Sequence, residues 1–303
     1  MARPGVAKID VDALIVGGGP AGLTAAIYLG RFRRSLALVD AGQSRLGLIP
    51  ITHNHPGFPD GVKGRVLWAR MKTQAEHYGA VVRTGAIESI HHQAKMFVCD
   101  LDGTEIRARF VVLATGVTDR PPAAHFAEAV KNALIRLCPI CDAYEVIDKQ
   151  IGVISIGERG AHEAIFLRDY SPHVTLLHAG KPAELNAKAR KMLAAAGIGL
   201  VEAEIVSVNL EGDRTVELAL ADGVRLGFDT VYSALGMDNR TGLAVALGAK
   251  TNEAGCLLVD EHQKTSVDGL YAVGDVVRGL NQISIAEAEA AIAATDIHNR
   301  LRA

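Results

Sequence analysis

Short apolar runs alternate along the chain with longer stretches that resemble helices. The run at residues 13–16 leads into glycines and then into an apolar-rich stretch at 23–29, and a second run at 36–40 ends in an acid. The same strand–helix–strand order begins again at 151–155 and continues to a run at 174–177. Strands that alternate with helices indicate βαβ units and a parallel sheet. The pattern therefore predicts an α/β fold built from two βαβ units.

A glycine-rich segment joins the first strand to the first helix. It satisfies the pattern G-x-G-x-x-G and consists of Gly17, Gly18, Gly19, Pro20, Ala21 and Gly22. Gly17 suits a tight turn, Gly19 lets the backbone approach a pyrophosphate, and Gly22 lets helix and strand pack closely. The N–H groups at the helix N-terminus suit phosphates. Asp40 ends the next strand, where an acid binds a ribose hydroxyl, so these residues predict a nucleotide site.

Composition limits the size, partners and compartment of the protein. The 303 residues are 49% hydrophobic, which suffices for two domains, and the 32 basic and 34 acidic residues nearly balance. This balance gives no electrostatic reason to expect nucleic acid or an anionic membrane as partner. Residues 1–5 lack the apolar region of a secretory signal, and no apolar run approaches a membrane span. Four cysteines without a framework fit a reducing compartment, so we expect a cytoplasmic protein.

The segment Cys138-Pro139-Ile140-Cys141 holds the only close cysteine pair in the sequence. A C-x-x-C pair beside βαβ units is typical of a dithiol that cycles with a disulfide. Pro139 favours a helix start, and a helix N-terminus would lower the pKa of the first thiol. The alternative is half of a zinc site, but zinc needs four ligands. Because Cys99 and Cys256 are isolated, we expect no metal and interpret both as buried structural thiols.

Two later apolar strands end in glycine-containing turns, Thr115-Gly116 and Gly274-Asp275. Together with the Gly17–Gly22 loop and the cysteine pair followed by Asp142, these turns resemble the low-molecular-weight thioredoxin reductases. The resemblance runs along nearly the whole chain. It includes the segments Asn54-His55-Pro56-Gly57, Gln74-Ala75 and Gln282-Ile283-Ser284.

The resemblance implies an α/β fold with two Rossmann-like dinucleotide-binding domains, the second inserted into the first. Residues 1–118 and 241–303 would form a discontinuous FAD-binding domain, and residues 119–240 an NAD(P)H-like domain that carries the cysteines. Relatives are usually homodimers, so we expect a homodimer. Besides the Gly17–Gly22 loop and Asp40, the resemblance assigns these residues to FAD binding: Asn54, Thr115, Gly116, Gly274, Asp275, Gln282 and Ile283.

The resemblance also assigns catalytic roles. Cys141 would lie against the flavin and accept its electrons, Cys138 would attack the substrate disulfide, and Asp142 would handle protons during the exchange. The alternative for Asp142 is an acid that the dipole of a helix N-terminus favours. Ala143 stands where many relatives carry glycine, which would alter the loop geometry. The expected substrate is a thioredoxin-like protein or a small disulfide or dithiol.

The inserted domain departs from the relatives that use NADPH. Where they carry a second G-x-G-x-x-G/A loop, this chain has Ser155 and the bulky Ile156. Where they carry two arginines for the 2′-phosphate, it has Ala179 and Gly180. NADPH is therefore a doubtful donor. The chain is more similar to the ferredoxin-linked and diflavin-type oxidoreductases of the wider family, so ferredoxin, a second flavin or substrate dithiols become candidate electron donors.

Three functions remain open from the sequence. The first is an FAD-dependent disulfide reductase that acts on a thioredoxin-like protein. The second is a flavin-dependent dithiol oxidase that passes electrons from a small dithiol to oxygen. The third is a non-catalytic flavin-binding redox sensor, against which the intact cysteine pair and Asp142 argue.

Overall fold

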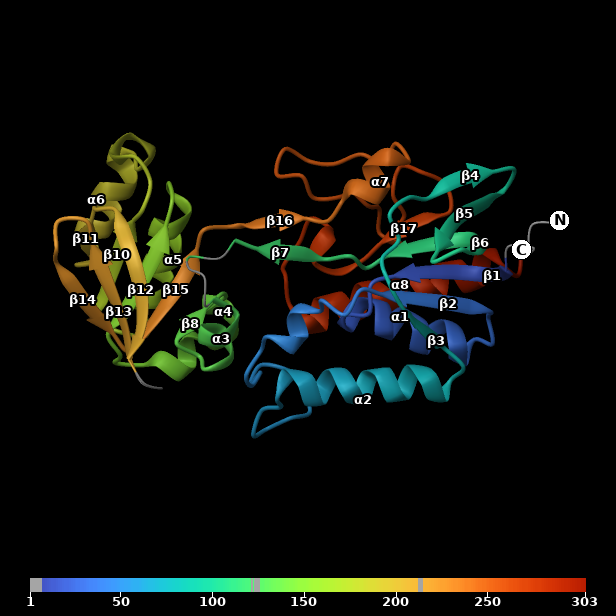
Figure 1. The fold of residues 1–303 in the computed structure, drawn as a ribbon, viewed down its shortest axis with the longest axis horizontal. Helices are drawn as coiled ribbons and strands as arrows, with labels where there is room; N and C mark the ends of the chain where they lie inside the picture. The colour runs from blue at the N-terminus through green and yellow to red at the C-terminus, as the bar shows by residue number, and fades with distance from the viewer. Residues whose placement is uncertain (1–6, 121, 123–125, 212–214) are drawn as a thin grey trace. The chain divides into compact units, whose positions relative to one another are not determined.

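The chain forms two compact units, and its path crosses between them four times. The computed structural model describes residues 7–120, 122, 126–211 and 215–303, so the N-terminal segment 1–5 interpreted above lies outside the described residues. The first unit comprises the chain up to Gly47, Gly64–Thr118 and Asn239–Ala303, and the second comprises Leu48–Lys63 and Asp119–Asp238. Figure 1 labels the elements of both units.

A mixed sheet forms the centre of the first unit. Its strand order is β3-β2-β1-β6-β5-β4, and β17 pairs with β6 beyond the end of β5. The strands are β1 (Ala7–Val16), β2 (Leu36–Asp40), β3 (Val81–Thr84), β4 (His91–Gln93), β5 (Met96–Leu101), β6 (Thr104–Leu113) and β17 (Leu270–Ala272). The pairs among β1, β2, β3, β6 and β17 are parallel, whereas β4 and β5 are antiparallel. The predicted strand at 36–40 is confirmed residue for residue.

Helix α1 packs against α8 and α2 in this unit (Figure 1). The helices are α1 (Pro20–Arg31), α2 (Gly64–His77), α7 (Gly242–Ala246) and α8 (Ile283–Arg300), with 3₁₀ turns η1 (Arg45–Gly47) and η4 (Gly274–Val276). The buried side of α1 includes Gly22, Ala25 and Ala26, whose small side chains allow close approach. The predicted helix at 23–29 is confirmed. It begins earlier, because Pro20 can occupy its first position, and it ends later, at Arg31.

The second unit contains the parallel sheet that the sequence predicts. Its order is β11-β10-β9-β15-β8, and a separate antiparallel sheet has the order β12-β13-β14. The strands are β8 (Ile135–Arg136), β9 (Ile151–Ser155), β10 (Val174–His178), β11 (Gly199–Val201), β12 (Ile205–Glu211), β13 (Thr215–Leu220), β14 (Arg225–Phe228) and β15 (Thr230–Ala234). The helices are α3 (Phe126–Lys131), α4 (Pro139–Asp142), α5 (Arg159–Arg168) and α6 (Ala187–Ala195), with 3₁₀ turns η2 (Ala143–Val146) and η3 (Pro182–Glu184). Strands β9 and β15 are buried throughout, as expected for central strands of a covered parallel sheet.

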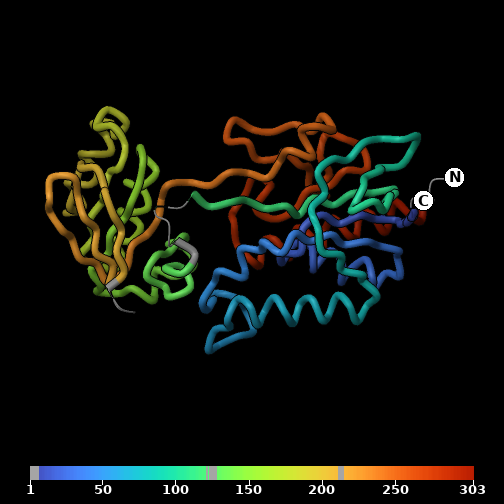
Figure 2. The backbone as a smooth tube through the Cα atoms, viewed as in Figure 1, coloured from blue at the N-terminus to red at the C-terminus, as the bar shows by residue number. Residues whose placement is uncertain are grey.

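A two-stranded ribbon of β7 (Val117–Asp119) and β16 (Met237–Asn239) carries the chain out of the first unit and back, as Figure 2 traces. The segment Leu48–Lys63, which the sequence analysis placed in the first domain, groups with the second unit. Leu48 packs there against the cluster that contains Val130 and Ile135. Among the described residues, no helix combines the length and the apolar character that crossing a membrane requires.

Candidate redox and nucleotide sites

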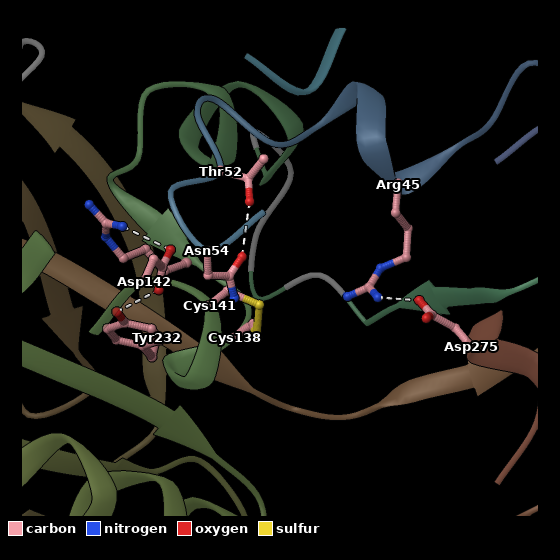
Figure 3. The surroundings of a disulfide bond; sticks show 9 residues. Arg45, Thr52, Asn54, Cys138, Cys141, Asp142, Tyr232 and Asp275 are labelled. Atoms are coloured by element: carbon pink, nitrogen blue, oxygen red, sulfur yellow. Dashed lines mark hydrogen bonds and ion pairs between the residues drawn. A yellow bond between two sulfur atoms is a disulfide. The ribbon is translucent and has the colours of Figure 1, made fainter. Parts of the chain in front are cut away.

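The two cysteines of the C-x-x-C segment form a disulfide at the start of α4 (Figure 3). Cys138 is the N-cap, Pro139 occupies the first helical position, and the Cys141 backbone N–H donates to the Cys138 carbonyl at 3.0 Å. The Cα atoms of Cys138 and Cys141 are 5.3 Å apart. Proline presets the helical φ and needs no hydrogen-bond partner at this position. The local sequence therefore builds the turn that brings the sulfur atoms together.

Asp142 follows the disulfide directly and is held from both sides (Figure 3). The Tyr232 hydroxyl donates to Oδ1 and the Arg136 guanidinium to Oδ2, each at 2.8 Å. Burial raises the pKa of Asp142 above its usual value, and the charge of Glu145 adds to this rise. Arg136 and the two hydrogen bonds act in the opposite direction. Sequence reasoning found Asp142 but missed its partners, since only the pairing of β8 with β15 brings Arg136 and Tyr232 together.

Ala143 and Asn54 are two further residues that the sequence analysis singled out near the cysteines. Ala143 has a helical φ of −65°, so the glycine found in relatives is not needed for this conformation. Asn54, assigned above to FAD, lies in the unit that carries the cysteines and is among the residues around the disulfide in Figure 3. Its Oδ1 accepts a hydrogen bond of 3.0 Å from the Thr52 hydroxyl, which fixes the orientation of the amide.

The Gly17–Gly22 loop of the first unit is closely packed. Whether a residue larger than glycine would fit differs from position to position. Gly17 has φ +111°, and a Cβ there would overlap the Ala114 carbonyl oxygen. A Cβ on Gly22 would overlap the carbonyl oxygen of Gly17. At Gly19, the N-cap of α1, a Cβ would meet nothing nearer than the Ser44 hydroxyl at 3.4 Å. Folding therefore requires Gly17 and Gly22, whereas Gly19 keeps open the space in front of the helix N-terminus.

Asp40, at the end of β2, stabilises this loop by accepting backbone hydrogen bonds. Its Oδ1 accepts hydrogen bonds from the backbone N–H groups of Gly18 at 3.2 Å and Gly42 at 3.1 Å. Trp68 on α2 donates from Nε1 to the Gly18 carbonyl at 2.7 Å. No sequence pattern indicates this contact, because Trp68 lies fifty residues from Gly18 along the chain. The loop, the helix N-terminus and the acid at the end of β2 fit a dinucleotide phosphate and ribose.

The remaining FAD candidates of the first unit follow neighbouring strands. Val16, Leu113 and Ala272, which end β1, β6 and β17, stand in register, so the turns after them share one edge of the sheet. After β6, the Thr115 hydroxyl donates to the Arg240 carbonyl at 2.7 Å, and Gly116 has φ +63°. Ligands of α/β sheets bind at this carboxyl edge.

The turn after β17 carries an ion pair that the sequence did not indicate. Arg45 of η1 donates from Nη1 to Asp275 Oδ2 at 2.7 Å (Figure 3), and both side chains are mostly buried. The backbone N–H of Gly274 donates to Glu289 on α8 at 2.7 Å. Helix α8 begins at Ile283, with Gln282 as its N-cap. Arg45 and Glu289 are therefore part of the candidate site, because they contact Asp275 and Gly274, which lie far from Arg45 in the sequence.

The corresponding loop of the second unit is filled by its own side chains. Ser155 is buried, and its hydroxyl accepts the backbone N–H of Gly160 at 3.0 Å. A Cβ on Gly160 would overlap the Ser155 side chain. Glu158, the N-cap of α5, accepts a hydrogen bond from Asn186. The N-cap of α5 therefore adds a negative charge at this helix N-terminus, which is unfavourable for binding a pyrophosphate there.

Arg190, a cation of the second unit near β10, already has several partners. Ala179 and Gly180 follow the strand in place of arginines. Arg190 of α6 donates to both carboxylate oxygens of Glu202, at 2.5 and 2.6 Å, and to the carbonyls of Leu185 and Pro182. A guanidinium with this many partners is not available to a 2′-phosphate without breaking them.

These features define a disulfide oxidoreductase of the two-unit dinucleotide-binding class. Residues 11–290 match the family model described as pyridine nucleotide-disulphide oxidoreductase, and the chain belongs to this family. It is 30% identical over 313 residues to a thioredoxin reductase of Peptoclostridium acidaminophilum, an alignment that covers 96% of this chain and 97% of the relative. The protein is a thioredoxin reductase-like oxidoreductase, and its family binds FAD.

Solved structures share this fold. The structure of HlmI superposes with a TM-score of 0.88 at 28% identity and covers 97% of this chain and 93% of that one. An oxidoreductase from Agrobacterium tumefaciens superposes with a TM-score of 0.83 at 27% identity, with 97% and 99% covered. Both likenesses extend over the described fold as a whole.

Proposed function

We propose that the protein passes electrons between FAD and the Cys138–Cys141 disulfide, and from there to a thioredoxin-like protein or a small disulfide. The observation that carries this proposal is the disulfide at the start of α4 with a held carboxylate, Asp142, directly after it. In the first unit, the Gly17–Gly22 loop and Asp40 would hold the dinucleotide part of FAD. The turns that contain Thr115, Gly116, Gly274 and Asp275 and the start of α8 at Gln282 and Ile283 would hold the rest.

The two sulfur atoms would have different roles. FAD supplies a two-electron carrier when bound, and Cys141 would be the sulfur that exchanges electrons with it. Cys138, at the N-cap of α4, would attack the substrate disulfide. Asp142 would hold the proton that the leaving thiolate takes up, because it is adjacent to Cys141 and partly buried.

Single serine substitutions test these roles. In Cys138→Ser, Cys141 should remain as a thiolate against the oxidised flavin and give a broad long-wavelength charge-transfer band. Cys141→Ser should lack this band. The opposite pattern would exchange the two roles, and a protein that purifies colourless and takes up no FAD would refute the proposal as a whole.

We further propose that NADPH is not an efficient electron donor. Ser155 occupies the backbone N–H that a phosphate would need, Glu158 adds negative charge at the same helix N-terminus, and the two arginines are absent. A charge-assisted hydrogen bond contributes roughly 1.5–3 kcal/mol. Because about 1.4 kcal/mol corresponds to a factor of ten, loss of the arginines alone weakens binding at least about tenfold. The donor would then be a ferredoxin-like protein, a second flavin or a substrate dithiol.

Anaerobic stopped-flow reduction of the flavin tests the electron donor. We expect slow or absent bleaching with NADPH and with NADH at micromolar concentration, and full bleaching with dithionite as the control for an intact flavin. Rapid, saturable reduction by micromolar NADPH would contradict this part of the proposal and leave the disulfide chemistry untouched. Steady oxygen consumption with small dithiols, without a protein acceptor, would favour the dithiol oxidase instead.

A further inference from the structure

The pairing of strands β8 and β15 brings two hydrogen-bond donors to Asp142. Tyr232 of β15 and Arg136 of β8 are direct partners in the parallel register. Each side chain supplies one donor to one oxygen of the carboxylate, at 2.8 Å in both cases (Figure 3). Two donors are better matched by the carboxylate, whose oxygens only accept, than by the carboxylic acid, one of whose oxygens also carries a proton. The two donors therefore favour the carboxylate form of Asp142.

Burial and the charge near Asp142 favour its protonated form instead. Burial raises the pKa of Asp142, and the charge of Glu145 on η2 raises it further. Tyr232 is fully buried, and burial raises the pKa of its hydroxyl, which therefore stays protonated and continues to donate. Helix α5, which packs against α4, carries Arg159 and Glu163, but these two pair with each other. The proton affinity of Asp142 thus depends on opposing contributions from a few identified groups.

We propose that Arg136 and Tyr232 are positioning residues that set the pH at which Asp142 takes up and releases the proton used in opening the Cys138–Cys141 disulfide. This inference rests on the role proposed above for Asp142. It goes further in naming the residues that tune this role.

The step balances with an external dithiol as reductant. One thiolate of the reductant forms a bond to Cys138 Sγ, the Cys138–Cys141 bond breaks, and its electron pair leaves on Cys141 Sγ. Protonated Asp142 gives its proton to that sulfur and is left as the carboxylate that Arg136 and Tyr232 bind. The second thiolate of the reductant then displaces Cys138, and the reductant ends as a disulfide.

Chemical reduction of the purified protein tests the inference without a flavin step, a nicotinamide or a protein partner. The disulfide is opened with dithiothreitol at a series of pH values, quenched with acid, and scored by mass spectrometry. Dividing each rate by the rate of Asp142→Asn at the same pH cancels the titration of the reductant and leaves the Asp142 inflection. Tyr232→Phe removes only the donated hydrogen bond, so the Asp142 inflection should move up by about one pH unit. Arg136→Met should move it up by about one to three units, and Arg136→Lys, which keeps the charge, by less.

The matched control is Tyr271→Phe. Tyr271 is equally buried and donates to a carboxylate, Asp296, but it belongs to the first unit and should leave the inflection unchanged. In an Asp142→Asn background, Tyr232→Phe should have no further effect on the pH profile. Unmoved inflections in Tyr232→Phe and Arg136→Met, or a shift that persists in the Asp142→Asn background, would overturn the inference. If Tyr232→Phe does not fold, the two Arg136 variants decide it.

Discussion

The two cysteines outside the disulfide, Cys99 and Cys256, differ in solvent exposure. Cys99 on β5 is buried, and its burial, with a smaller contribution from the charge of Asp100, raises its pKa to about 11. Cys256 is half-buried. At pH 8 a thiol of pKa 11 is ionised to roughly one part in a thousand, and the thiolate is the reactive form.

Alkylation should therefore separate these thiols. With the disulfide intact, iodoacetamide at pH 8 should label Cys256 first and leave Cys99 unmodified until the protein is unfolded. Peptide mass spectrometry reads both sites, and unfolding in urea is the positive control for Cys99. Fast labelling of Cys99 in the folded protein would contradict the burial of β5.

A pair of glycine substitutions should separate folding from cofactor binding. Gly22→Ala forces its Cβ into the Gly17 carbonyl, so the apo-protein should lose about 1–3 kcal/mol of stability. Gly19→Ala meets only the Ser44 hydroxyl at 3.4 Å and should fold nearly as the wild type. It should nevertheless bind FAD more weakly, because the methyl group stands in front of the helix N-terminus. Urea unfolding and FAD titration measure the two effects, and an equal loss of stability in both variants would refute this distinction.

At the scale of elements, α6 has a defined N-terminal cap. The Asn186 side chain accepts the backbone N–H of Ala189 at 2.8 Å, and its amide also donates to Glu158. Asn186→Ala should cost about 1 kcal/mol of unfolding free energy. Asn186→Ser, which can still cap, should recover most of the loss. Urea unfolding measures both, and an Asn186→Ala protein as stable as the wild type would show that the cap contributes nothing.

Two strands were predicted residue for residue, whereas the strand expected at 13–16 begins earlier, at Ala7. The strands at 36–40 and 151–155 match β2 and β9, because a buried parallel strand is a continuous apolar run with sharp polar ends. The helix expected at 23–29 begins at Pro20 and ends at Arg31. Helix ends depend on capping contacts as well as on apolar spacing, so the pattern fixes them less well.

At the scale of the whole molecule, tryptophan fluorescence reports on the unfolding of the first unit. Trp68 is the only tryptophan of the sequence and donates to the Gly18 carbonyl in the first unit. FAD at a hundred times its Kd should stabilise this unit by about 2.7 kcal/mol. The tryptophan transition in urea should therefore move to higher denaturant when FAD is added.

Asp275→Ala should lose most of this FAD-dependent shift, because a mostly buried acceptor is removed. The matched control is Asp268→Ala, which also removes an acid paired with an arginine, Arg300, but at an exposed position of the same unit. It should keep the shift. A full shift in Asp275→Ala would remove this residue from the candidate FAD site.

The sequence by itself determined the local features of this protein. The Gly17–Gly22 turn, the buried strands and the disulfide at the start of α4 all depend on residues within a few positions of one another, so their pattern is visible in the chain. Only the tertiary structure decided which distant side chains meet. Arg136 reaches Asp142 beside Tyr232 because β15 lies between β9 and β8. Strand order follows from packing of the whole sheet, and no local pattern of residues specifies it.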